Sequence, residues 1–236
     1  MTAKSAPVSH DKAHPASGDP VERPADSRVH GQLFVISAPS GTGKTSLVTA
    51  LLARQKQLKV SVSHTTRAPR QGEVDGEHYH FVTQQDFLER QAAGAFLESA
   101  DVFGNLYGTC SDWVDEQIKG GIDVILEIDW QGAAQVRRLR PETRSIFILP
   151  PSLTVLESRL RNRKSDADDV VAKRLGKASS EMTHYPEYDY LIVNDDFDTA
   201  LEALAAVFLA ERHSLARQAP ALADILSDLC GADTGH

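Results

Sequence analysis

The chain has 236 residues, of which 41% are apolar and 25% are charged. With 15 glycines, these shares are those of an ordinary globular domain, and they predict one domain with subdomains rather than several independent ones. The 25 basic and 33 acidic side chains give a net charge of −8, which argues against a generic nucleic-acid binder and against a basic membrane-surface protein.

The sequence carries no sign of membrane insertion or export. No apolar run approaches the ~20 residues that a membrane span needs, and the beginning of the chain lacks the apolar stretch of a secretory signal. The two cysteines, Cys110 and Cys230, are too few and too far apart for a disulfide framework or a zinc site. We therefore expect a cytoplasmic protein with two reduced thiols.

Residues 1–30 differ in composition from the rest of the chain. They contain four of the 11 prolines, no Phe, Tyr or Trp, and acidic and basic side chains that cancel. Such a segment cannot bury enough apolar surface to offset the entropy lost on ordering, so we expect a disordered arm.

From residue 33 onward, short apolar runs alternate with helix-like stretches. Strands are predicted at 33–37, 124–128, 145–149 and 190–193, and helices at 46–56, 131–139, 152–163, 168–182 and 198–215. Buried runs joined by helices are typical of an α/β fold with a parallel sheet covered on both faces. A short peripheral helix is expected past Pro220, ending near Gly231. Residues 64–110 break the rhythm with glycines and an alternating 79–82 string, and they predict a small, partly antiparallel insertion.

The segment between the first strand and the first helix has the composition of a phosphate-binding loop. Gly41 and Gly43 let backbone N–H groups converge on phosphate oxygens, and the following helix points its positive end at the same anion. Lys44 supplies a mobile charge for the β- and γ-phosphates, and the Thr45 hydroxyl can ligate Mg²⁺. The alternative is a glycine-rich turn with an incidental lysine. The residues predicted to bind a nucleoside triphosphate are Ala38, Pro39, Ser40, Gly41, Thr42, Gly43, Lys44 and Thr45.

Carboxylates follow the apolar run at 124–128. Glu127 and Asp129 stand where residues near a metal are found in this kind of fold. Alternatively, Asp129 caps the helix that follows.

Two arginines three residues apart, Arg67 and Arg70, suggest an acceptor that carries a phosphate. Guanidinium groups hold phosphates firmly, and Tyr79 and Tyr107 offer phenolic donors. Two loop arginines can equally be a solvated edge of the protein.

The ordered set of motifs resembles the guanylate kinase family from about residue 32 to residue 217. The segments that carry the resemblance are 37–45 (SAPSGTGKT), 62–70 (VSHTTRAPR), 72–79 (GEVDGEHY), 103–108 (FGNLYG), 128–132 (IDWQG), 147–152 (FILPPS) and 192–196 (IVNDD). The resemblance implies a phosphate-loop kinase core over residues 31–217, with a small mixed GMP-binding lobe at about 64–120, a helical lid at about 157–175 and a tail at 218–236.

The family also implies an activity and site residues. It implies transfer of the γ-phosphoryl group of ATP to GMP with Mg²⁺, in purine nucleotide metabolism, with no nucleic-acid or membrane partner. It implies that Arg67, Arg70, Tyr79 and Tyr107 hold the acceptor phosphate, and that Ser63, Glu98 and Thr109 read guanine. It further implies catalytic roles for Lys44 and Arg67, a lid carrying Arg159, Arg163 and Arg174, Asn194 near the adenine, and Glu127 and Asp129 at the GMP site.

The chain departs from the family pattern in three places. Glu127 stands where the family commonly has Asp, which alters a contact with guanine or with Arg70. Leu106 replaces a frequent Tyr, and Lys164 replaces a Gly after Arg163, so the lid turn differs or carries an extra cation.

Two other functions compete with the kinase. One is an inactive guanylate-kinase-like module that binds phosphorylated proteins, which need not keep Lys44, the loop glycines or the lid arginines. The other is a related kinase with a different acceptor. Ser63, Glu98 and Thr109 argue against it, because together they favour guanine.

Overall fold

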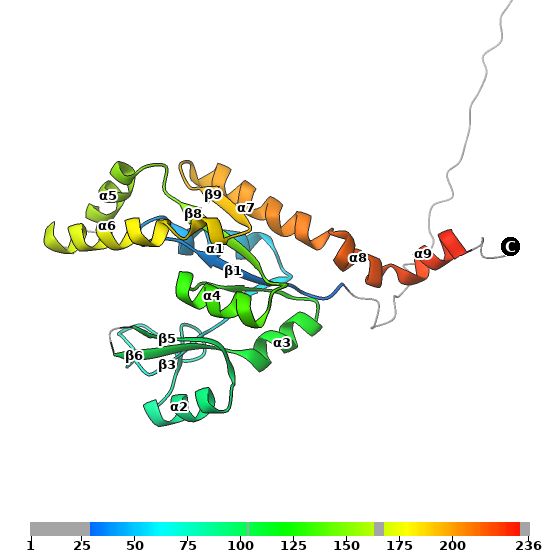
Figure 1. Cartoon of the computed structure of the whole chain (residues 1–236), viewed down its shortest axis with the longest axis horizontal. Coiled ribbons are helices and arrows are strands. Elements are labelled where there is room, and N and C mark those ends of the chain that lie inside the picture. Colours follow the sequence, from blue (N-terminus) through cyan, green and yellow to red (C-terminus); the bar gives the residue numbers. More distant parts are fainter. Residues whose placement is uncertain (1–28, 103, 163–167, 232–236) are drawn as a thin grey trace, which may run out of the picture.

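The computed structural model describes residues 29–102, 104–162 and 168–231 (Figure 1). The predicted arm therefore lies outside the described residues, apart from residues 29 and 30. Five parallel strands form the central sheet in the order β2-β7-β1-β8-β9. These strands are β1 (Leu33–Ser37), β2 (Leu58–Val60), β7 (Asp123–Leu126), β8 (Arg144–Leu149) and β9 (Tyr190–Val193).

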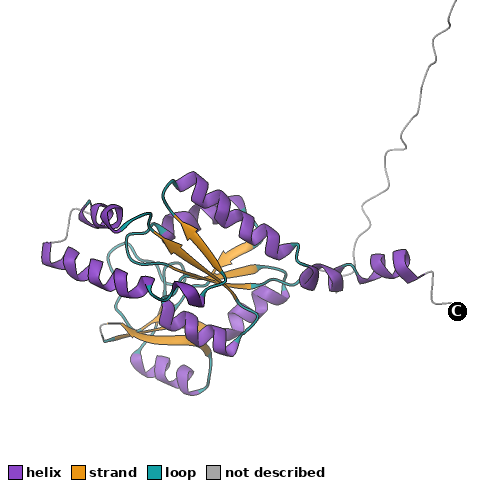
Figure 2. Ribbon diagram, turned by 45° about the horizontal axis from the view of Figure 1, so that its top comes forward, coloured by secondary structure: helices purple, strands orange, loops and turns teal. Residues whose placement is uncertain are grey.

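Helices cover both faces of this sheet (Figure 2). They are α1 (Lys44–Arg54) and α7 (Phe197–Arg212) on one face, and α3 (Ser111–Lys119) and α4 (Trp130–Leu139) on the other. The central strand β1 shows why both faces are apolar. Phe34 and Ile36 pack toward α1 and α7, while the alternate residues Leu33 and Val35 pack toward α3 and α4. A strand buried on both faces reads as a continuous apolar run, as predicted.

A second, smaller sheet lies below the α3 and α4 side in Figure 1 and has the order β4-β3-β6-β5. Its elements are β3 (His64–Thr65), β4 (His80–Phe81), β5 (Phe96–Val102) and β6 (Asn105–Cys110), with α2 (Gln84–Ala92) packed on them. The pairs β3–β6 and β5–β6 are antiparallel and β3–β4 is parallel, so the predicted partly antiparallel insertion is confirmed. The Gln135 amide of α4 joins this lobe to the core, because it accepts from Ser99 N at 3.2 Å and donates to Ser99 O at 3.1 Å.

The helices α5 (Leu153–Arg161) and α6 (Asp168–Met182) pack on each other through Leu156, Leu160, Val171 and Ala178. They follow β8 and lead, through a 3-10 turn at Tyr185–Glu187, into β9. Just past α6, His184 stacks on Trp130 of α4 with 3.6 Å between ring centroids. This contact ties the end of α6 to the helix that also holds the lobe.

Most predicted elements are confirmed, and the misses are short or polar. The strands at 33–37 and 190–193 and the helix at 168–182 have the predicted bounds, and the predicted helix past Pro220 is α9 (Ala223–Cys230). The sequence pattern did not predict β2, which has only three residues, nor α2 and α3. Phe87 is the sole buried residue of α2, so that helix shows little apolar periodicity. Within the described ranges, the structure contains no helix with the length and apolar character needed to cross a bilayer.

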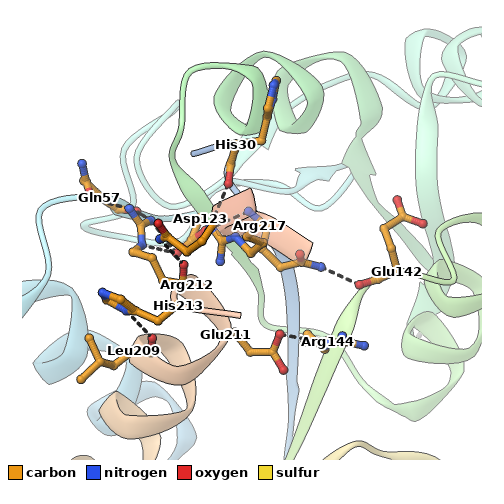
Figure 3. Close-up of polar contacts among 12 residues, drawn as sticks. His30, Gln57, Asp123, Glu142, Arg144, Leu209, Glu211, Arg212, His213 and Arg217 are labelled. Atoms are coloured by element: carbon orange, nitrogen blue, oxygen red, sulfur yellow. Dashed lines mark hydrogen bonds and ion pairs between the residues drawn. The ribbon is translucent and has the colours of Figure 1, made fainter. Parts of the chain in front are cut away.

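A buried ion cluster fastens the C-terminal helices to the amino end of the sheet (Figure 3). The Asp123 side chain is 2% exposed and stands at the start of β7. It accepts hydrogen bonds from Arg212 Nη2 of α7 at 2.6 Å, from Arg217 Nη2 of α8 (Leu215–Ala221) at 2.7 Å and from Gln32 N at 2.8 Å. One carboxylate therefore links two helices to the sheet on the side away from the strands' carboxyl ends.

We expect Asp123→Asn to lower the free energy of unfolding by about 3 kcal/mol, because removing one partner leaves buried arginine charge uncompensated. The matched control is Glu202→Gln, whose carboxylate is 70% exposed in its pair with Arg54 and should contribute less than about 1 kcal/mol. Urea unfolding of the two variants measures the difference. Equal, small losses in both would contradict a stabilising role for the Asp123 cluster.

Candidate functional site

Two glycines shape the loop that joins β1 to α1. Gly41 and Gly43 have φ angles of 91° and 97°, a region that side-chain-bearing residues rarely adopt. Gly43 is the N-cap of α1, and no side chain caps that end of the helix. The first-turn amides are therefore available to an anion. A hollow of about 180 Å³ lies over this loop, lined by Ala38, Pro39, Ser40, Gly41, Gly43, Lys44, Thr45 and Ser46.

The underside of the loop is held by side chains from two other elements. The buried Asn194, which follows β9, donates from Nδ2 to the Thr42 carbonyl at 2.7 Å. Arg159 of α5 donates to the Asn194 carbonyl at 3.0 Å, and the Thr42 hydroxyl turns inward to the Pro39 carbonyl at 2.7 Å. A Cβ on Gly43 would lie 2.5 Å from Asn194 Nδ2, so glycine is required there by this contact as well. In this structure Asn194 and Thr42 support the loop from beneath; contact of either with ATP stays a prediction.

Lys44, Thr45 and Glu127 meet at the mouth of the loop. Lys44 Nζ lies 3.7 Å from Glu127 Oε2, and the Thr45 hydroxyl donates to the same oxygen at 3.4 Å. Burial lowers the pKa of Lys44, and the Glu127 carboxylate opposes that shift. Glu181 of α6 also acts electrostatically on Lys44, and burial raises the pKa of Glu181. Glu181 was missed because it lies in a helix and in none of the motifs.

An open cleft of about 740 Å³ begins at this cluster and runs to the lobe. It brings together residues that are far apart in the sequence. The predicted site residues that line it are Lys44, Thr45, Ser63, Tyr79, Thr109 and Glu127. The carboxyl ends of the parallel strands β1, β2 and β7 all face this region, which explains how loops distant in the chain converge.

Glu98 is a buried carboxylate on β5, only 5% exposed. It stands opposite Thr109 on β6, and the Thr109 hydroxyl donates to Glu98 Oε1 at 2.6 Å. Burial raises the pKa of Glu98, while the hydrogen bond from Thr109 acts in the opposite direction. Glu98 is therefore a buried acid within a strand pair and not a surface acid at a strand end.

Arg67 lies among aromatic rings of the lobe. Its Nε donates to the Tyr107 hydroxyl at 3.3 Å, and its guanidinium carbon lies 5.3 Å from the centre of the Tyr79 ring. Its Nη2 donates to Glu73 Oε1 at 2.8 Å, and Glu73 is not among the predicted site residues. The sequence contains one signal for this contact, which is an acidic residue three positions after Arg70. Arg70 is exposed at the rim of the same segment.

The remaining predicted residues take varied places. Asp129 is the N-cap of α4 and accepts from the amides of Gln131 and Gly132, both at 3.0 Å, so the capping alternative is confirmed. Arg174 lies on α6. Arg163 and Lys164 fall outside the described residues. A role for Asp129 at the acceptor and roles for the lid arginines stay predictions.

Comparisons with known proteins agree on one family. The sequence model of the guanylate kinase family matches residues 30–211. A guanylate kinase of Hahella chejuensis is 60% identical over 188 residues, which cover 80% of this chain and 90% of the relative. One of Escherichia coli K12 is 56% identical over 190 residues, covering 80% and 92%. The crystal structure of guanylate kinase from Anaplasma phagocytophilum matches with a TM-score of 0.68 at 34% identity, over 85% of this chain and 95% of that one.

We expect Glu98→Gln to gain stability relative to the wild type as the pH rises from about 4.5 to 8. Burial raises the folded-state pKa of Glu98 above its ordinary value of 4.5. The neutral carboxyl therefore favours folding below that value, and this contribution is lost as the pH rises through the raised pKa. An amide does not ionise, so the variant avoids the loss. Thermal unfolding across this pH range measures the difference, with the exposed Glu89→Gln as a control without such a trend. A difference that is flat or of opposite slope would contradict the assignment.

Proposed function

Because the chain belongs to the guanylate kinase family, we propose that it transfers the γ-phosphoryl group of ATP to GMP, giving ADP and GDP, in the cleft between the loop 38–45 and the lobe. The observation that carries this proposal is the cleft itself, which joins Lys44 at one end to Ser63, Tyr79 and Thr109 at the other. The reaction serves purine nucleotide metabolism and the recycling of GMP in the cytoplasm.

The loop residues hold the donor. The uncapped first turn of α1 and the backbone of the loop bind the phosphates of ATP, and Lys44 contacts the β- and γ-phosphates. In this structure Lys44 Nζ lies 3.7 Å from Glu127 Oε2. The donor phosphates bring more negative charge than one carboxylate, so Lys44 turns to them while Glu127 holds the lysine nearby.

Thr45 and Glu127 also suit Mg²⁺. This ion prefers hard oxygen ligands, and it takes one or two from the protein and the rest from water and phosphates. The Thr45 hydroxyl and the Glu127 carboxylate are 3.4 Å apart, which is a donor set of that kind. When bound, Mg²⁺ neutralises charge on the β- and γ-phosphates. We therefore propose a role for Glu127 on the donor side of the cleft, and its predicted place at the GMP site stays a prediction.

The lobe holds the acceptor. Arg67, Arg70, Tyr79 and Tyr107 bind the phosphate of GMP, whose oxygen attacks the γ-phosphorus. That phosphate is already anionic, so no strong general base is needed and rate enhancement comes from alignment and charge neutralisation. Glu98, with Ser63 and Thr109, binds the guanine edge.

The lid excludes water that would otherwise take the phosphoryl group. We assign this part to the lid predicted at about 157–175, with Arg159, Arg163 and Arg174 sharing the charge of the transferred group. Arg159 Nη1 donates to the Asn194 carbonyl at 3.0 Å, which holds its guanidinium beside the loop.

We expect Lys44→Ala to lower kcat by about 10²–10³-fold, because it removes a preorganised charge at the phosphates undergoing transfer. The fold should remain intact, since the Lys44 side chain is 20% exposed and lies outside the apolar core. A coupled ATP and GMP assay with circular dichroism measures both, and Lys119→Ala, an exposed lysine on α3, is the control. A Lys44 variant within a few fold of the wild type would refute phosphoryl transfer at this loop.

We expect Glu98→Gln to lower kcat/KM for GMP by about 10²-fold and to narrow the GMP-to-AMP ratio. Guanine offers two donors on one edge, N1–H and the 2-amino group, and one carboxylate accepts both. Adenine leaves that buried carboxylate unpaired, and sites of this kind discriminate by about 10⁴-fold. The side-chain amide of the variant keeps one acceptor oxygen. It places an NH2 donor where the second carboxylate oxygen would accept from guanine. Steady-state kinetics with both nucleotides test this, and an unchanged ratio would remove Glu98 as the guanine reader.

A further inference from the structure

The carboxylate of Glu73 bridges the two arginines of the acceptor segment. Its Oε1 accepts from Arg67 Nη2 at 2.8 Å, and its Oε2 accepts from the backbone N–H of Arg70 at 2.7 Å. The Glu73 amide in turn donates to the Arg70 carbonyl at 3.0 Å, which closes a turn. The side chains of Arg67 and Glu73 are only 13% and 16% exposed, so water weakens their attraction less than at an open surface.

Arg67 still has donors to spare. A guanidinium has five N–H bonds, and three are committed: Nε to the Tyr107 hydroxyl, Nη1 to the Ala68 carbonyl at 2.7 Å and Nη2 to Glu73. One hydrogen remains on each Nη. The guanidinium of Arg70 makes no hydrogen bond or ion pair within the part of the chain that the structure describes. The segment therefore offers one restrained cation with two open donors beside one free cation.

We propose that Glu73 is a positioning residue for the acceptor phosphate, holding the Arg67 guanidinium and the Arg70 backbone so that both side chains meet that phosphate together. This inference rests on the proposed function. Arginine has large rotamer freedom, and fixing its planar head before the ligand arrives reduces the entropy lost on binding. Glu73 stays ionised at neutral pH, because the hydrogen bonds from Arg67 and Arg70 lower its pKa to about 2.

A second effect of Glu73 opposes the first, since a carboxylate repels a phosphate. Arg67, Arg70 and Glu73 together carry one net positive charge, so the segment still attracts a dianion. The carboxylate also uses only one of the two hydrogens on Nη2 and leaves the other for the phosphate. Positioning thus outweighs repulsion, and Glu73 strengthens GMP binding.

Steady-state kinetics and calorimetric GMP titration of full-length Glu73→Gln test this. The side-chain amide of the variant is uncharged. Its NH2 group faces one of the two N–H groups that donate to a carboxylate oxygen in the wild type. We expect KM for GMP and its Kd to rise about tenfold, the effect of one charged hydrogen bond. KM for ATP, kcat and Tm should change little, a split that a merely structural role would not produce. The control is Glu77→Gln, which removes the same charge from the same segment but has no hydrogen bond to either arginine in the described structure.

Each other outcome overturns the inference. A fall in KM for GMP would show that Glu73 competes with the phosphate, and equal shifts in Glu73→Gln and Glu77→Gln would assign the effect to charge alone. An unchanged KM for GMP would exclude a positioning role. A loss of affinity for both GMP and ATP, together with a lower Tm, would exclude it as well. If Glu73→Gln does not fold, Glu73→Asp replaces it, since its shorter side chain cannot span both partners and should weaken GMP binding alone. A wild-type protein that does not phosphorylate GMP would refute the proposed function instead.

Discussion

The hydrogen bond from the Asn194 amide to the Thr42 carbonyl fixes the relation between the sheet and the loop above it. It needs a glycine at 43, because the amide occupies the space that a side chain would take. With the loop backbone set in this way, α1 begins at Lys44 and points its uncapped amides outward. Arg159 of α5 donates to the carbonyl of the same Asn194. The helix that we assign to the lid therefore contacts the residue that supports the loop.

The loop and the lobe each pair a cation with a carboxylate. Lys44 faces Glu127 at the loop, and Arg67 faces Glu73 in the lobe. Ion pairs of this kind keep partly buried cations charged and oriented without a ligand, and burial alone would lower the pKa of Lys44. They differ in one respect. Lys44 Nζ lies 3.7 Å from Glu127, whereas Glu73 accepts two hydrogen bonds of 2.8 and 2.7 Å. We therefore expect a phosphate to exchange with the first pair more easily than with the second.

The sequence predicts the sheet and the loop because their signals are local. A strand buried on both faces is a continuous apolar run, and a loop that binds phosphate needs glycines at set positions. The family resemblance adds Glu98, whose burial against Thr109 no single-strand pattern reveals, since the two residues meet only through strand pairing. The support by Asn194, the bridge by Glu73 and the approach of Glu181 are tertiary contacts between distant or irregular segments. Residue type alone does not encode them.

The acidic chain as a whole does not prevent an anion-binding cleft. Charges farther away than the screening length of about 8 Å at physiological salt contribute little, so the net charge of −8 matters less than the groups that line the cleft. Those groups are not uniformly basic. The cleft is lined by Lys44 and Lys59 and also by Glu77 and Glu127. The buried Glu98, hydrogen-bonded to the cleft residue Thr109, lies where we propose that the base binds. Under the proposed function, the buried Glu98 carboxylate would favour one direction of the acceptor, because an acceptor bound backwards would place its phosphate against that carboxylate.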